Sequence, residues 1–529
     1  MPKQLFFNSS FFLLCFLSLL LVVSSMAFVL GFDLSIYNVF LSFLFSILIL
    51  SYVVRTTSLD VLLSVLLSLI IIFISYQAAI HYFDTSWDGQ GYHQETIYLL
   101  KNGWNPIYED SHSYRVWVNL YQKGNEIIQA NVYLVSHKIE AGKLFNLLLV
   151  YIAFIVFYSF LETIKIQGIY RWLLSFIVVF NPIVFTQVFT YYIDGNWYLT
   201  LLISLTSLMV YFSQRQLQFL IIFILSSVVF CSLKFSSIPV FVVFSFFAIV
   251  YHYIGQKKVM IIPYFSILVL VLVSNIHPFI TNVQRGNHLL HPFVGEKKID
   301  IINQNIPELL LNKNRVERLM ISLFSKTHND FKKADLSDVL KFPFVFTKEE
   351  FFINYDTRLG GFGFLFSGVL VFVFILAFYL FLKKRQANKK KIVLLLAALL
   401  VSIMINPASW WPRLSAQIWL LPIVLIIFGL VSKKRILVLL SQITVGLLLV
   451  NILISGSITV IRLQQDNKIV HDFISTVGDK TITLDLTNPL GFQQYYLKFK
   501  ERKIKYKLEK IRDKNKLAPF TPDVYYKIE

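Results

Sequence analysis

Long runs of apolar residues dominate the chain, and short polar segments separate them. A helix needs roughly 20 apolar residues to cross the hydrocarbon core of a bilayer, and the runs predict about thirteen such helices. No small-residue cleavage site follows the first run, so we expect it to be a retained helix rather than a removed signal peptide. The expected spans are 11–31, 37–54, 61–80, 144–161, 172–189, 197–212, 217–233, 238–253, 260–276, 360–382, 392–405, 417–431 and 436–454.

Three longer polar segments interrupt this pattern. Two are large loops, and the third is a basic tail in which 471–476 reads as helix and 481–486 alternates like a strand. The predicted fold is therefore an all-α polytopic membrane protein with a small α/β domain at its C-terminus. Its expected parts are helices 1–80, a first large loop 81–143, helices 144–276, a second large loop 277–359, helices 360–456 and the small domain 462–529.

Basic residues in the short loops predict the orientation. Alternating the helices across the membrane places every basic cluster on one side, and loops rich in Lys and Arg face the cytoplasm. The N-terminus is then inside, and the two large loops and the C-terminal domain are outside. The clusters are Lys3, Arg55, Lys165 with Arg171, Arg215, Lys257 with Lys258, 383–391 and 433–435.

Composition supports a lipid environment. Of 529 residues, 56% are hydrophobic and only 15% are charged. The mean hydropathy is +0.65. Soluble chains average below about half apolar, so we expect the bilayer to be a partner of this protein. The formal net charge of +19 is spread among the spans, which does not favour a nucleic-acid partner. The two cysteines lie inside apolar runs and indicate no disulfide framework.

The first large loop carries the densest group of candidate catalytic residues. Asp84 and Asp88 lie directly after a predicted span, and 89–93 reads Gly-Gln-Gly-Tyr-His. A carboxylate that is partly desolvated at the membrane interface has a raised pKa and suits general-base catalysis. Two glycines allow the backbone to turn and to approach a ligand. The alternative is a set of ordinary solvated loop charges among interfacial aromatic residues.

Three other predicted outer segments carry isolated charged residues. Asp194 lies in a very short turn between two apolar runs, where an acidic residue is often functional, although an Asp-Gly turn needs no function. The second large loop ends on Asp356 and Arg358. The last short turn reads Trp-Trp-Pro-Arg at 410–413. Arg413 either anchors the protein at the aromatic belt or binds an anionic head group through paired hydrogen bonds.

Several kinds of site have no sequence signal. The histidines show no metal-ligand spacing such as His-x-x-x-His, so no metal ligand is assigned. The chain contains no Walker loop, Rossmann fingerprint or Gly-x-Ser-x-Gly elbow. A soluble nucleotide as an energy source is therefore unsupported.

The motifs together resemble those of polytopic GT-C glycosyltransferases, most closely uncharacterised bacterial members. The resemblance covers residues 84–419 and rests on the acidic motif at 87–93, the turn at 192–195 and the Trp-Trp-x-Arg element at 410–413. It also includes Asn-x-x-x-Gly-x-x-x-x-His-Pro at 282–292 and Asp-x-Arg-x-x-Gly-Phe-Gly at 356–363. GT-C enzymes place the acidic loop after the first span, whereas about three spans precede it here.

The resemblance implies transfer of a sugar from a polyprenyl-phosphate donor to a glycan, lipid or protein acceptor. The expected site is the outer face of a bacterial cytoplasmic membrane, toward the periplasm or the exterior. Asp88 is the preferred base, with Asp84 as the alternative, and Asp194 would orient the acceptor or hold Lys123. The donor phosphate would contact Arg413, Arg358 and Lys123. Sugar and acceptor contacts would come from Tyr92, His93, Glu95, Trp104, Asp356, Trp410 and Trp411. A divalent metal is compatible with this mechanism but not required.

Two other functions remain open from the sequence. A polysaccharide polymerase or ligase would share the topology. It would bind polyprenyl pyrophosphate through arginines, for which Arg358 is a candidate, and would depend on arginine and histidine more than on Asp88. A transporter or flippase would need charged or Gly/Pro-broken spans near the membrane midplane, and the sequence shows few. Lys234 lies near the end of a span, where it can snorkel.

Overall fold

The computed structural model describes residues 2–54, 57–166, 168–256, 261–327, 335–382, 389–486, 494–511, 516–521 and 524–529. Within them the protein is mostly helical and carries one small sheet. The basic loops at Arg55, Lys257 with Lys258, and 383–388, which the sequence predicts to face the cytoplasm, lie outside the described residues.

Long apolar helices make up the membrane part of the described chain. Seven are long and apolar enough to cross a bilayer, or up to eight when a pair bent by 60° is taken as one span. The seven are Lys3–Val29, Ile36–Val54, Ser58–His81, Ile139–Thr163, Asp194–Gln214, Pro412–Leu430 and Arg435–Val477. The chain is therefore an integral membrane protein. The larger number of spans predicted from the sequence is not established, although each predicted run contains a helix.

One predicted span is broken for a local reason, and another is followed by a bend. The run 172–189 divides into α8 (Ile169–Val179) and α9 (Pro182–Gln187) because Asn181 caps α9 and Pro182 supplies its first position. The bent pair is α13 (Ile261–Ser274) with α14 (Ile276–Gln284), which contains Pro278. The remaining apolar helices are α1 (Pro2–Val29), α2 (Ile36–Val54), α3 (Ser58–His81), α7 (Leu144–Thr163), α10 (Asp194–Gln214), α11 (Leu217–Leu233), α12 (Ser237–Gln256), α18 (Phe366–Leu382), α19 (Lys389–Met404), α20 (Leu420–Leu430) and α21 (Arg435–Val477).

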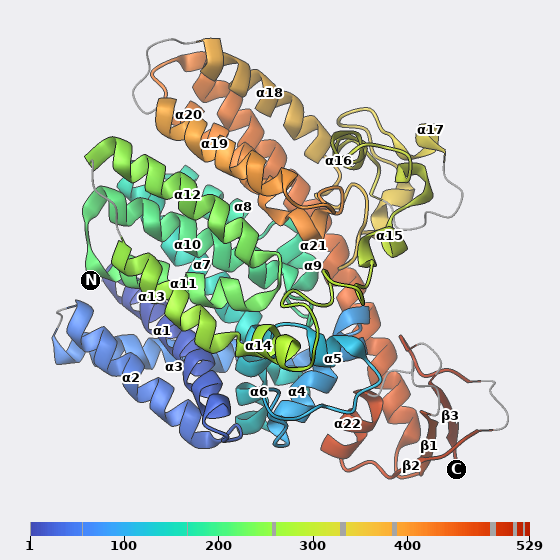
Figure 1. The fold of residues 1–529 in the computed structure, drawn as a ribbon. Helices are drawn as coiled ribbons and strands as arrows, with labels where there is room; N and C mark the ends of the chain where they lie inside the picture. The colour runs from blue at the N-terminus through green and yellow to red at the C-terminus, as the bar shows by residue number, and fades with distance from the viewer. Residues whose placement is uncertain are drawn as a thin grey trace.

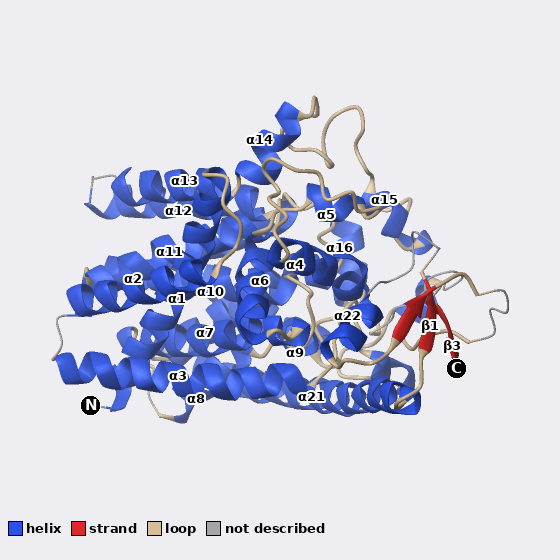
Figure 2. Ribbon diagram, turned by 90° about the horizontal axis from the view of Figure 1, so that it is seen from below, coloured by secondary structure: helices blue, strands red, loops and turns tan. Residues whose placement is uncertain are grey.

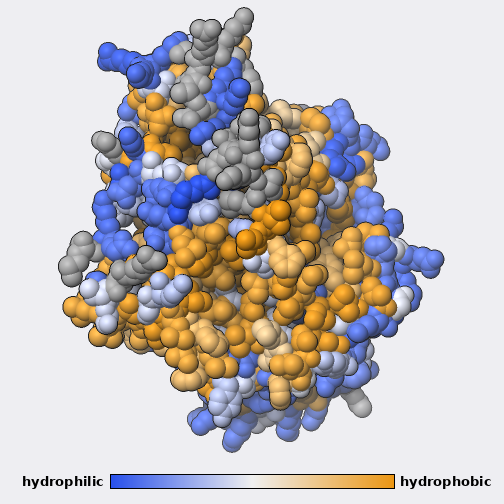
Figure 3. Space-filling model, turned by 60° about the vertical axis from the view of Figure 1, so that its left-hand side comes forward, coloured by the Kyte–Doolittle hydropathy of each residue, from blue (hydrophilic) through white to orange (hydrophobic). Residues whose placement is uncertain are grey.

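The polar elements gather at one end of these helices. In Figure 1 the N-terminus lies at the left, α4–α6 lie at the lower middle, and α15–α17 and the strands lie at the right. Figure 2 shows the strands at the opposite side from the N-terminus. Figure 3 shows a broad apolar surface over the helices with hydrophilic residues around it. The polar helices are η1 (Gly89–His93), α4 (Gln94–Lys101), α5 (Val116–Leu120), α6 (Gly124–Ser136), η2 (Ile139–Lys143), α15 (Ile301–Asn305), η3 (Glu308–Leu310), α16 (Arg315–Leu323), α17 (Leu336–Val339), η4 (Lys348–Phe352), η5 (Pro412–Trp419) and α22 (Gln494–Glu501).

The C-terminal domain contains the predicted strand. β1 (Ile482–Asp485) lies between β2 (Tyr506–Leu508), which is parallel to it, and β3 (Tyr525–Ile528), which is antiparallel. The predicted helix at 471–476 is the end of α21, which runs unbroken through the expected boundary at 456–462.

The first large loop packs on this C-terminal domain. Phe83 joins the buried apolar cluster that α21 forms with the sheet. The backbone N–H of Phe83 donates to Asn467 Oδ1 at 3.1 Å, and Gln90 Nε2 donates to the carbonyl oxygen of Phe520 at 3.0 Å. The domain therefore holds both sides of the segment that carries Asp88.

Candidate active site

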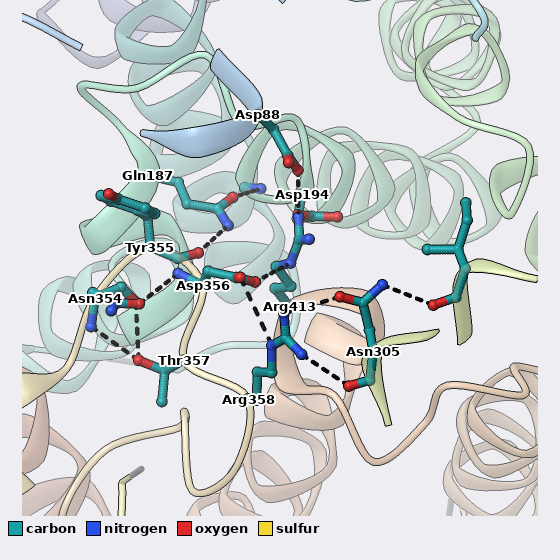
Figure 4. Close-up of polar contacts among 12 residues, drawn as sticks. Asp88, Gln187, Asp194, Asn305, Asn354, Tyr355, Asp356, Thr357, Arg358 and Arg413 are labelled. Atoms are coloured by element: carbon teal, nitrogen blue, oxygen red, sulfur yellow. Dashed lines mark hydrogen bonds and ion pairs between the residues drawn. The ribbon is translucent and has the colours of Figure 1, made fainter. Parts of the chain in front are cut away.

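Arg413 lies at the centre of a cluster of charged side chains at the polar end of the helices (Figure 4). Its Nη1 atom is 3.1 Å from Asp88 Oδ2 and 3.1 Å from Asp194 Oδ2. Its Nε atom is 2.7 Å from Asp356 Oδ1. The structure thus brings together three carboxylates that lie in three separate polar segments of the sequence.

Local structure fixes each of these side chains. Asp88 immediately precedes the π-helical turn η1, a type of turn that is frequent at functional sites. Asp194 opens α10, where the helix dipole favours a negative charge. Asp356 precedes α18 on a loop whose Asn354 side chain accepts a hydrogen bond from the Asp356 N–H at 2.8 Å. Arg413 lies in the first turn of η5.

Gln187 connects two of these segments. Its Oε1 atom accepts a hydrogen bond from the N–H of Gly195 at 2.9 Å, and its Nε2 atom donates to the carbonyl oxygen of Tyr355 at 2.9 Å. The Gln187 side chain therefore ties the turn of Asp194 to the loop of Asp356 (Figure 4). No sequence motif points to this residue.

Lys234 is a second residue that the sequence motifs do not include. Its Nζ atom is 2.7 Å from Asp194 Oδ1 and lies 4.6 Å from the centre of the Trp197 ring. The side chains of Lys234 and Asp194 are 7% and 2% exposed. Asp194 is thus held between two cations, Lys234 on one oxygen and Arg413 on the other, which makes it a fixed, inaccessible carboxylate.

Arg358 completes the cluster on the side of the second large loop. Its guanidinium donates to the carbonyl oxygen and to Oδ1 of Asn305, both at 2.9 Å, and its Nε atom is 3.9 Å from Asp356 Oδ2. The guanidinium carbons of Arg358 and Arg413 lie 4.8 and 4.5 Å from the centre of the Trp411 ring. Asp356 and Trp411 therefore both connect the two arginines.

The charges of this cluster balance. Asp88, Asp194 and Asp356 face Arg413, Arg358 and Lys234. Burial raises the pKa of the Asp356 carboxyl; Arg413 opposes this shift, and the nearby Asp88 reinforces it. Asp356 therefore loses its charge more readily than an exposed aspartate does.

Tyrosine rings line the same region. Tyr92 stacks on Tyr121 with ring centres 5.7 Å apart, and Tyr192 stacks on Tyr355 at 5.4 Å. The Arg413 guanidinium lies 4.7 Å from the centre of the Tyr192 ring. Burial raises the pKa of the Tyr92 hydroxyl, and the charge of Asp88 raises it further.

Asp84 belongs to a different, fully buried cluster. Its carboxylate accepts hydrogen bonds from the N–H of Ser86, from Gln94 Nε2 and from the N–H of Tyr191, and the residue is 1% exposed. The Asp84 N–H donates to Glu140 Oε2. Because Asp88 is 19% exposed, it is the more accessible carboxylate of the two.

The cluster around Glu140 joins the first large loop to the C-terminal domain. Glu140 Oε2 is 2.5 Å from Lys143 Nζ, and Glu140 Oε1 is 3.5 Å from Lys498 Nζ. Lys498 is 2% exposed and comes from α22. Burial lowers the pKa of Lys498, and Glu140 opposes that shift. Lys498 thus adds a buried ionic contact to the apolar packing of Phe83.

A third cluster holds Lys123 and His93. The Lys123 ammonium donates to the carbonyl oxygen of Tyr121 at 2.5 Å, and His93 Nδ1 is 2.5 Å from Glu126 Oε1. Burial lowers the pKa of Lys123 to about 8, which Glu126 partly opposes. The sequence-based expectation that Lys123 shares phosphate binding with Arg413 and Arg358 therefore gains no support, because its ammonium is committed to the backbone of its own loop. Its contacts are those of a buried structural group.

The remaining candidates for sugar or acceptor binding make their described contacts with groups other than Arg413. Glu95 is on α4, and its pKa is raised by burial, which Ser113 and Arg115 oppose. Trp104 is buried, and its Nε1 atom donates to the carbonyl oxygen of Glu109 at 3.3 Å. Trp410 is fully buried and stacks on Trp411 at 5.5 Å within an apolar cluster of the second large loop. These contacts support the fold of the loops.

The described residues contain no group of three or more His, Cys, Asp or Glu side chains placed to hold a metal ion. Around Arg413 the reason is visible, because the guanidinium occupies the space between the three carboxylates.

Comparison with known proteins adds no family to this picture. No protein-family model matches the chain, and a search of curated proteins gave no match.

Proposed function

We propose that this protein is a GT-C-type glycosyltransferase, which moves a sugar from a polyprenyl-phosphate donor to a glycan, lipid or protein acceptor of the cell envelope. The observation that carries the proposal is the contact between Asp88 and Arg413: a partly exposed carboxylate lies 3.1 Å from a guanidinium at the polar end of apolar helices. A proton acceptor and a phosphate ligand are the two groups that this reaction needs. The resemblance of the motifs to GT-C enzymes supports the same reaction.

In the proposed reaction, Asp88 accepts the proton of an acceptor hydroxyl. The hydroxyl oxygen bonds to the anomeric carbon of the sugar with inversion, and the bond between that carbon and the phosphate oxygen breaks. Arg413 and Arg358 stabilise the charge that develops on the leaving lipid phosphate. A general base contributes typically about 10²–10⁴-fold to the rate. Asp194, held by Lys234, positions Arg413 rather than taking part in proton transfer.

We also propose that the site faces away from the cytoplasm. The described basic residues Lys3, Lys165 and Lys433 are at the opposite helix ends from Asp88, Asp194 and Asp356 in the alternation of helices along the chain. Short basic loops favour the cytoplasmic side. The donor would then enter sideways from the bilayer with its phosphate at the outer interface of a bacterial cytoplasmic membrane.

The test measures release of polyprenyl phosphate from a panel of radiolabelled polyprenyl-phosphate sugars by protein in lipid vesicles, with cell-surface glycan extract as acceptor. We expect wild type to release carrier and Asp88→Asn to lose about 10²-fold or more of the rate while it still binds donor. Asp110→Asn is the matched control, because Asp110 is an exposed carboxylate of the same loop.

Each other outcome contradicts a specific part of the proposal. Equal release by wild type and Asp88→Asn would remove Asp88 as the base. Consumption of pyrophosphate-linked oligosaccharides, with no release from any monophosphate donor, would replace the transferase with a polymerase or ligase. Movement of intact donor across the vesicle membrane without cleavage would indicate a flippase.

A further inference from the structure

Asp356 lies between the two arginines and is an anion, as a bound phosphate would be. Its Oδ1 atom is 2.7 Å from Arg413 Nε, and its Oδ2 atom is 3.9 Å from Arg358 Nε. Each arginine turns its Nε atom toward Asp356, and guanidinium groups bind phosphates as well as carboxylates. Both arginines also lie over the Trp411 ring, which fixes their separation. The pair is therefore an anion site whose present occupant is a carboxylate of the same chain (Figure 4).

We propose that Asp356 is a built-in competitor that holds the phosphate site closed until a phosphate ligand displaces its carboxylate from Arg413 and Arg358. This inference rests on the proposed function, because it takes the ligand to be the phosphate of the lipid carrier. It differs from the expectation that Asp356 contacts the sugar or acceptor. It also predicts the direction of the change in affinity: loss of this carboxylate strengthens phosphate binding, whereas loss of a supporting side chain would weaken it.

Among the three carboxylates on Arg413, Asp356 is the one best able to leave. Its side chain is 24% exposed, compared with 19% for Asp88 and 2% for Asp194. Asp194 has a second cation on its other oxygen, whereas Asp356 has a more distant one. Burial also raises the pKa of Asp356, so its charged carboxylate is less stable in the protein than in water. An incoming phosphate would replace one anion by another and keep the cluster close to neutral.

The size of the effect follows from competition. When an internal group occupies a site for part of the time, the apparent affinity of the ligand is its intrinsic affinity multiplied by the fraction of time that the site is free. Occupancy of the arginines by Asp356 for about nine-tenths of the time would weaken phosphate binding about tenfold. Asp356→Asn should therefore bind phosphate about tenfold more tightly than wild type.

Calorimetry on the detergent-solubilised full chain tests this with three probes: a short-chain polyprenyl phosphate, the matching polyprenol and inorganic phosphate. Asp356→Asn and Asp356→Ser are compared with wild type and with Glu296→Gln, which removes an exposed negative charge from the same loop. The expected result is tighter binding of polyprenyl phosphate in both Asp356 variants, unchanged binding of polyprenol, and no change in Glu296→Gln. A parallel gain for inorganic phosphate assigns the site to the free anion, and its absence assigns the site to the lipid head group.

Weaker or unchanged phosphate binding in the Asp356 variants would overturn the inference, as would an equal gain in Glu296→Gln. Absence of phosphate binding in every variant would overturn it too. These outcomes are independent of sugar transfer. A protein that fails to release carrier from any donor can still show the gain, and an active transferase can lack it.

Discussion

Replacement of Lys234 by Met should destabilise the protein mainly by leaving the Asp194 carboxylate undercompensated. The two side chains form a 2.7 Å ion pair and are 7% and 2% exposed, so water screens the pair little. Met keeps an unbranched apolar chain over Trp197, which limits the loss of packing. The effect of the substitution is therefore chiefly electrostatic.

The geometry sets the expected size. At 2.7 Å the attraction between unit charges is about 6 kcal/mol at an effective dielectric constant of about 20, and desolvation offsets much of it. Removal of one partner of a buried pair typically costs about 3–5 kcal/mol. Because Arg413 still neutralises the other oxygen of Asp194, we expect about 3 kcal/mol for Lys234→Met. The double variant with Asp194→Asn should lose less than the sum of the singles, with a coupling of about 2 kcal/mol.

The assay is reversible unfolding by sodium dodecyl sulfate in mixed micelles, with the free energy of unfolding measured for wild type, both single variants and the double variant. Lys165→Met is the control for loss of one lysine, because Lys165 is exposed at the opposite helix end. Additive effects in the double variant, or a Lys234→Met protein as stable as wild type, would refute the argument that the pair is a buried, coupled contact.

Three other changes test separate parts of the structure. Lys498→Met should speed amide hydrogen exchange in residues 84–95, because it removes the ion pair of the C-terminal domain with Glu140; unchanged exchange would show that apolar packing alone holds the loop. The pKa of Lys123 is lowered to about 8 in the fold, so the unfolded chain binds more protons between that pH and the usual value of 10.5. The contribution of Lys123 to stability should therefore rise with pH across this window, and Lys123→Met should make the rise smaller in a pH series of unfolding measurements. Gly363→Ala should lower the free energy of unfolding by about 1–3 kcal/mol, because Gly363 has φ +97° and a Cβ there would lie 2.6 Å from Asn451 Oδ1; an unchanged value would contradict the close packing.

Alternation of helices makes much of the candidate site predictable. Asp88, Asp194 and Arg413 are far apart in sequence, but each follows or precedes an apolar run at a helix end that the basic loops assign to the same side. The same reasoning applies to Lys234, which ends the run before α12. Its position at the end of a span favours a snorkelling role. The hydrophobic pattern does not reveal that Asp194 is its neighbour across the bundle.

Other features depend on tertiary packing that the pattern does not encode. Lys123 and Trp104 lie in the same loop as Asp88, but α4–α6 fold around their own polar and apolar contacts and direct both side chains inward. Trp410 has the sequence context of an interfacial aromatic residue and is instead the core of the second large loop. The number of spans does not follow from the hydrophobic pattern alone, because Asn181 and Pro182 divide one apolar run into two short helices.

Helix α21 connects the membrane mechanically to the candidate site. Its 43 residues make a rod about 64 Å long, roughly twice the thickness of the hydrocarbon core. The apolar half is embedded in the membrane, and the sheet follows the far half. In the far half, Asn467 accepts a hydrogen bond from the backbone N–H of Phe83. A change in bilayer thickness that tilts this rod would swing its outer end and pull on the segment that leads to Asp88. If the protein is the proposed transferase, we expect its rate to depend on the chain length of the surrounding lipid, without any bound ligand.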